Sequence, residues 1–75
     1  MAQTRLLARL EIVEGQIALG EANIEVQLGL IKELRAKGYP PADAEAHLAV
    51  LAATLVGNLA ERDRLRAEMA ALPRP

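Results

Sequence analysis

Mainly apolar residues recur along two stretches of the chain in alternating steps of three and four residues. The first series is Leu6, Leu10, Val13, Ile17, Gly20, Ile24, Gln27, Ile31 and Leu34. The second is Leu48, Leu51, Leu55, Asn58, Arg62, Leu65, Met69 and Leu72. This heptad spacing is typical of helices that pack along one seam, as in coiled coils and bundles. The pattern therefore predicts two amphipathic helices.

One strong break separates the two series, at Gly38-Tyr39-Pro40-Pro41. Glycine can adopt the left-handed conformation that ends a helix, and proline can occupy the first position of the next helix. We therefore predict a first helix at about 3–37, a turn at 38–40 and a second helix at about 41–72. Helices joined by so short a turn must fold back on each other. The expected fold is all-α, an antiparallel two-helix hairpin.

Folding the chain about this turn brings the two seams together. The register that we expect places Leu34 opposite Leu48, Ile31 opposite Leu51, Gly20 opposite Arg62 and Ile17 opposite Leu65. Val13 would then meet Met69, and this agreement of the two seams supports the hairpin.

The run from Ala46 to Ala60 contains no acid, lysine or arginine, which raises the question of a membrane span. As a helix it would be about 22 Å long, shorter than the hydrocarbon core of about 30 Å. The helix that faces it is uncharged only from Val26 to Ile31, about 9 Å. We therefore expect a buried helix of a cytoplasmic protein and no transmembrane span.

Further apolar residues lie outside the two seams: Val26, Leu28 and Leu30 on the first helix, and Val50, Val56 and Leu59 on the second. Two helices cover only one stripe each, so an isolated hairpin would leave these residues in water. Self-association into a four-helix or larger bundle would cover them. The expected oligomer interface comprises Ile24, Leu28, Ile31, Leu48, Leu51, Leu55, Val56 and Leu59.

Four neutral polar residues fall at one level of the expected hairpin: Asn23, Gln27, Thr54 and Asn58. Buried amides in a helical bundle penalise slipped or wrongly oriented pairings. The alternative is a ligand or ion site, but metal sites usually require carboxylates or histidines, which this group lacks. We interpret the group as a polar core layer that fixes the register.

Gly15, Gly20, Gly29 and Gly57 lie inside the predicted helices, where each costs about 1 kcal/mol relative to alanine. Close approach of a second helix is the interpretation that we favour. A hinge in the first helix is the alternative.

The composition gives no indication of an enzyme. The 75 residues suffice for one small domain, 1–75, with no cysteine and a single aromatic residue, Tyr39. His47 has no evident catalytic partner. The net charge of −1 disfavours a nucleic-acid binder, and acids alternate with the arginines of the tract 61–66. We expect no cofactor and no metal.

A set of structural positions links the chain to known proteins: Gly20-Glu21, Ile24, Gln27, Leu34, Gly38, Ala44, Leu48, Leu51 and Arg62-Asp63-Arg64-Leu65. On these residues the stretch from about Gly20 to Met69 resembles a group of small uncharacterised bacterial proteins with predicted helical hairpins. The architecture is also similar to the repressor-of-primer hairpin. The resemblance implies a coiled-coil hairpin but no activity.

Two functions remain open at this point. The first is a homo-oligomeric structural or protein-interaction module, which could also dock an unknown protein partner on its charged faces. The alternative is a small RNA-binding four-helix bundle of the repressor-of-primer type. A contiguous stripe of Arg5, Arg9, Arg62, Arg64 and Arg66 would favour RNA.

Overall fold

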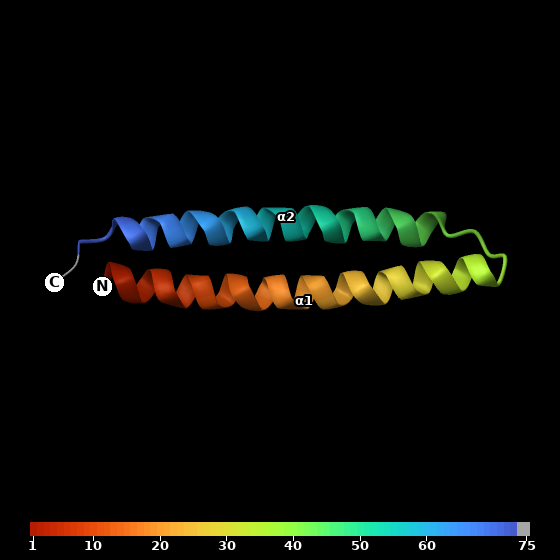
Figure 1. Cartoon of the computed structure of the whole chain (residues 1–75), viewed down its shortest axis with the longest axis horizontal. Helices are drawn as coiled ribbons and strands as arrows, with labels where there is room; N and C mark the ends of the chain where they lie inside the picture. Colours follow the sequence, from red (N-terminus) through yellow and green to blue (C-terminus); the bar gives the residue numbers. More distant parts are fainter. Residues whose placement is uncertain (74–75) are drawn as a thin grey trace.

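A computed structural model describes residues 1–73 and shows two long helices, α1 (Ala2–Ala36) and α2 (Ala42–Ala71), which pack antiparallel (Figure 1). The start of α1 and the end of α2 lie together at the end opposite to the turn (Figure 1). The predicted all-α hairpin is confirmed. Residues 74–75 of the predicted domain lie outside the described residues.

The turn that reverses the chain depends on one glycine. Gly38 has a φ of 78°, in the left-handed region that favours glycine. Its N–H donates to the carbonyl of Arg35 at 3.1 Å, and the N–H of Tyr39 donates to the carbonyl of Leu34 at 2.9 Å. These two bonds are the Schellman motif, which pairs the last carbonyls of a helix. Pro41 then precedes α2 as its N-cap instead of being its first residue.

The hydrophobic core is a thin strip between the helices. Its centre, near the open end, is Leu65, which is fully buried and packs with Val13 and Ile17. Near the turn, Ile31 and Ala44 are also buried. The radius of gyration is 17.3 Å, whereas a compact chain of this length would have about 11 Å. A molecule so elongated has little interior.

The pairing across the hairpin agrees with the expected one at Leu65 and differs from it at Gly20. Ile17 packs with Leu65, as expected. A Cβ atom added at Gly20 would lie 3.8 Å from Cδ1 of Leu55, so Gly20 lies beside Leu55 and not beside Arg62. The buried Gln27 side chain donates to the backbone carbonyl of Ala44 at 3.0 Å.

The difference at Gly20 has a physical reason in the repeat itself. Each seam residue of one helix lies near more than one seam position of the other, so apolar spacing alone does not select its neighbour. At Gly20 the neighbour is Leu55, whose side chain lies at an ordinary contact distance from the Cβ position.

Within residues 1–73, neither helix contains a segment that is both long and apolar enough to cross a membrane.

Candidate self-association surface

The hairpin leaves much of its apolar content in contact with solvent. The exposed large apolar residues are Met1, Leu7, Ile12, Leu19, Val26, Leu28, Leu30, Tyr39, Val50 and Val56. A compact monomer of 8.1 kDa would expose about 4,500 Å², whereas this chain exposes 5606 Å². The excess, about 1,100 Å², is more than one partner buries in a standard protein–protein interface, about 800 Å².

The residues expected at the oligomer interface fall into two groups. Ile31 is buried, and a further five are partly buried between the two helices of the hairpin: Ile24, Leu48, Leu51, Leu55 and Leu59. Leu28 and Val56 are instead 50% and 65% exposed. The hairpin therefore uses most of this set for its own packing, and only these two residues are mainly free for a second molecule.

Leu28 lines a shallow groove beside the turn. Its walls and floor are formed by Leu28, Ile31, Arg35, Glu45, Leu48, Ala49 and Ala52. Arg35 and Glu45 form an ion pair across the helices at 2.7 Å at one end of it. Most of the lining is apolar, which is the composition expected of a surface that another helix covers.

The four residues of the predicted polar layer do not form one cluster in the hairpin. Asn23, Thr54 and Asn58 line a single open groove between the helices. The Thr54 hydroxyl donates to the carbonyl of Val50 in its own helix at 3.0 Å. Gln27, one helical turn from Asn23, does not line this groove, and its amide donates to the carbonyl of Ala44. Among the described residues no buried side-chain nitrogen or oxygen lacks a hydrogen-bond partner.

A further apolar stripe lies on α1. Ile12, Leu19 and Val26 are spaced seven residues apart and are 62%, 63% and 72% exposed. Val26 was recognised from the sequence, but Ile12 and Leu19 were not. The signal that could have found them was present: this second repeat, at positions 12, 15, 19, 22 and 26, runs beside the first and has no charged residue at any of these positions.

The arginines considered for RNA binding are mostly engaged by carboxylates. Across the helices, Arg9 pairs with Glu61 at 3.0 Å and Arg66 with Glu14 at 3.6 Å. Arg64 bonds to Glu61 and Glu68, and Arg62 bonds to Asp63. The positive charges therefore lie next to negative ones and do not form a contiguous basic stripe.

Glu61 and Arg64 are electrostatically coupled. The hydrogen bond from Arg64 is the main cause that lowers the pKa of the Glu61 carboxyl below its ordinary value, and the charges of Arg64 and Arg9 add to it. The same bond raises the pKa of Arg64. Both groups are in contact with solvent, so the pair contributes little to stability.

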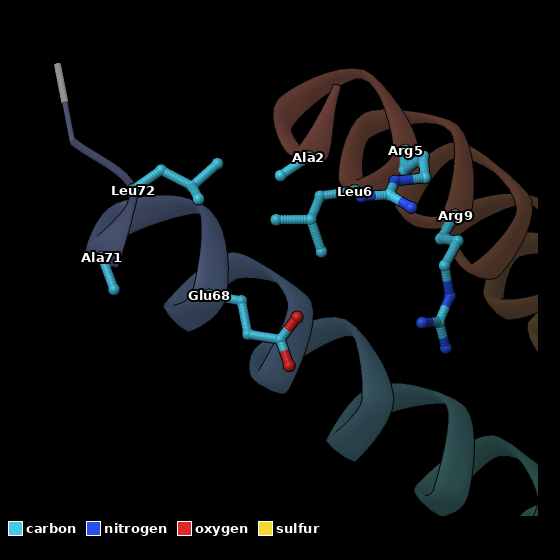
Figure 2. A pocket seen from close by; sticks show the side chains of 7 residues that line it. All are labelled: Ala2, Arg5, Leu6, Arg9, Glu68, Ala71 and Leu72. Carbon is cyan, nitrogen blue, oxygen red and sulfur yellow. The ribbon is translucent and has the colours of Figure 1, made fainter.

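A third groove lies at the open end of the hairpin, between the start of α1 and the end of α2. Figure 2 shows its lining, with Leu6 and Leu72 pointing toward one another, Arg5 and Arg9 on α1, and Glu68 on α2. The groove combines apolar groups with charges of both signs. This mixture does not select an anion or a cation.

The described residues contain no group of three histidines, cysteines or carboxylates that could hold a metal ion. His47 is exposed near the start of α2.

No protein-family model, no curated protein and no solved structure matches this chain. The hairpin architecture comes from the structure, and the resemblance to bacterial hairpin proteins stays a prediction from sequence.

Proposed function

We propose that the protein is a non-enzymatic, homo-oligomeric helical-bundle protein that acts as a structural or protein-interaction module. One observation carries this proposal: the hairpin exposes more large apolar side chains than it buries. Its buried apolar residues are Val13, Ile17, Ile31, Ala44 and Leu65. Exposed apolar surface of this extent marks an interaction surface in soluble proteins.

The energetics of so thin a core support the same proposal. Among residues 1–73, only Leu65 has a side chain less than 2% exposed. Domains of this size are marginally stable even when they are compact, because the entropy of ordering the chain nearly cancels the gain from apolar burial. Association with further copies would bury the exposed residues and add to the stability of the fold.

RNA binding of the repressor-of-primer type has less support. Affinity for nucleic acid depends on basic groups that are free to neutralise phosphates. Here the arginines of α2 are paired with carboxylates of the same protein, as is Arg9 of α1. The cytoplasmic location stays a prediction from sequence.

Thermal unfolding at several protein concentrations tests the proposal. If folding and association are coupled, the melting temperature followed by circular dichroism rises with protein concentration, because mass action favours the oligomer. A melting temperature that does not change over a hundredfold range of concentration would contradict the proposal.

A further inference from the structure

The outer side of α1 carries a second heptad seam that the hairpin does not use. Three large residues, Ile12, Leu19 and Val26, alternate with three small ones, Gly15, Ala22 and Gly29. All six are exposed. Their steps of four and three place them on one face of the helix. The neighbouring Val13 and Ile17 point into the hairpin core, so most of this face looks away from α2. Leu19 lies at its edge, where it also lines the open groove between the helices.

The two glycines of this seam have no role within the hairpin. A Cβ atom added at Gly15 or Gly29 would meet nothing within 4 Å. Gly20 differs, because it lies beside Leu55. Glycine weakens a helix, so two glycines that both fall within one exposed apolar seam call for a contact outside the hairpin. Gly57 also has open space at its Cβ position, but it does not belong to such a seam. Small residues allow another helix to approach closely, with its large side chains seated above them.

We propose that this seam binds the same seam of a second copy, antiparallel, with a two-fold axis between Leu19 and Ala22. The inference rests on the proposed function, for which it specifies one contact. In this arrangement Ile12 faces the partner's Gly29, Leu19 faces the partner's Ala22, and Val26 faces the partner's Gly15. Every layer then combines one large and one small side chain, and the symmetry repeats each layer on the other side of the axis.

Charge distinguishes the antiparallel arrangement from a parallel one. Glu11 and Lys32 flank the seam near its two ends, and neither has an ion-pair partner within residues 1–73. In the antiparallel pair, Glu11 lies close to the partner's Lys32, and the symmetry produces this contact twice. In a parallel pair, the flank that carries Glu11 would lie against the partner's other flank, so Glu11 would lie near the partner's Gln16 and would gain no opposite charge.

The opposite edge of the seam is also complementary. Gln16 and Asn23 flank it on the side of the open groove that Asn23 lines. The two-fold axis brings Gln16 close to the partner's Asn23. Amide side chains carry both donors and acceptors, so they can pair with each other. The proposal therefore gives Asn23 a role in matching two molecules, in place of one in the core of a single hairpin.

The hairpin exposes more surface than a compact monomer would, and this excess is large enough for a standard protein–protein interface. Its surplus of about 1,100 Å² over a compact monomer exceeds the share of one partner in a standard interface. Because most of the seam faces away from α2, the two α1 helices lie at the centre of the dimer and the two α2 helices lie outside. The faces that carry Leu28, Val50 and Val56 remain available for further association.

A matched pair of glycine substitutions tests the contact. Gly29→Leu and Gly57→Leu each replace an exposed helical glycine with no atom within 4 Å of its Cβ position. Both should favour the helix. Only Gly29→Leu should collide with Ile12 of the second copy, so we expect it to raise the dissociation constant in analytical ultracentrifugation at least tenfold. Gly57→Leu should leave that constant within about twofold. Equal effects, or a larger effect of Gly57→Leu, would overturn the proposal.

Cysteine cross-linking tests the direction and the register. The chain has no cysteine, so Ile12→Cys and Gly29→Cys each provide a single thiol. When the two variants are mixed, refolded together and oxidised, we expect a 12–29 disulfide between different chains to be the main product. Mixing Ile12→Cys with Ala22→Cys is the register control, and it should give little cross-linked product. A main product of 12–12 disulfides would indicate parallel helices and overturn the proposal.

The failure of this inference can be distinguished from failure of the proposed function. Leu19→Asp places a charge at the centre of the seam, and Val56→Asp places one on an equally exposed residue of α2. We expect Leu19→Asp to give monomers at concentrations where Val56→Asp is still associated. An oligomer that survives Leu19→Asp but not Val56→Asp would overturn the α1 seam while retaining the proposed function. A wild-type chain that is monomeric would overturn both.

Discussion

The two sides of helix α1 have the same kind of pattern and different surroundings. On the inner side, Val13, Ile17 and Ile31 are at most 7% exposed because α2 covers them. On the outer side, Ile12, Leu19 and Val26 repeat every seven residues and are more than 60% exposed. Heptad spacing therefore shows which faces of a helix are built to be covered. It does not show whether the cover comes from the same chain or from another copy.

The inner side differs from the outer one in the polar groups that accompany it. Gln27 is buried there and is hydrogen-bonded to Ala44, which contributes to fixing α2 in one register. The outer side carries two glycines that contact nothing in the hairpin. The first arrangement is complete within one molecule, and we propose that a helix of a second copy completes the other.

The largest effect is expected at the centre of the inner contact. Leu65→Ala should lower the free energy of unfolding by about 3 kcal/mol, because it removes a fully buried side chain and leaves a cavity. Urea titration followed by circular dichroism measures this loss. The control is Val50→Ala, at a residue 62% exposed, which should change it by less than about 0.5 kcal/mol. If the two variants lose the same free energy of unfolding, the contacts of Leu65 are not the main ones that stabilise the hairpin.

A second prediction compares a glycine that the turn requires with one that packing tolerates. Gly38→Ala should destabilise the protein by about 1 kcal/mol, because alanine is strained at a φ of 78°. Gly20→Ala should stabilise it by about 0.5–1 kcal/mol, because the new methyl group meets Leu55 at an ordinary contact distance and alanine favours the helix. Thermal melts of the two variants check the signs of these two changes in stability. A destabilising Gly20→Ala would indicate a closer helix approach than the structure shows.

A third prediction concerns the polar groove between the helices. Asn58 is partly buried there, and Asn58→Leu should keep the free energy of unfolding or raise it by up to about 1 kcal/mol, because the polar desolvation cost is removed. The specificity that the amide provides should be lost. We expect native mass spectrometry to show mixed oligomers or hairpin orientations. A single unchanged oligomer would contradict the role of Asn58 in fixing the register.

The smallest effect is expected from pH. Because the pKa of Glu61 is lowered in the folded protein, its pair with Arg64 stabilises the fold above the ordinary carboxyl value of 4.5 and loses this effect as the pH falls through the lowered value. Comparing melting temperatures of wild type and Glu61→Gln between pH 7 and pH 3 measures this contribution. The wild type should have a small advantage at pH 7 that disappears in acid. An advantage that grows in acid would contradict this assignment.

The sequence was sufficient to predict the hairpin, because Gly38 and the prolines mark the turn and two long heptad seams mark the helices. It was not sufficient to select the neighbour of every seam residue: Ile17 packs with Leu65 as expected, but Gly20 lies beside Leu55 and not beside Arg62. The bond from Gln27 to the backbone carbonyl of Ala44 depends on such local detail, so it could not be foreseen. The second seam on α1 was visible as spacing, but its exposure became known only when α2 had been placed.

Size-exclusion chromatography with multi-angle light scattering tests self-association most directly. We predict a mass at least twice the 8.1 kDa of the chain at micromolar concentration. Under the same conditions, Leu19→Asp should reduce this mass while the helical content of the remaining folded protein is retained. A folded wild-type protein that elutes at 8.1 kDa at every concentration tested would contradict the claim that its exposed apolar faces bind further copies of the chain.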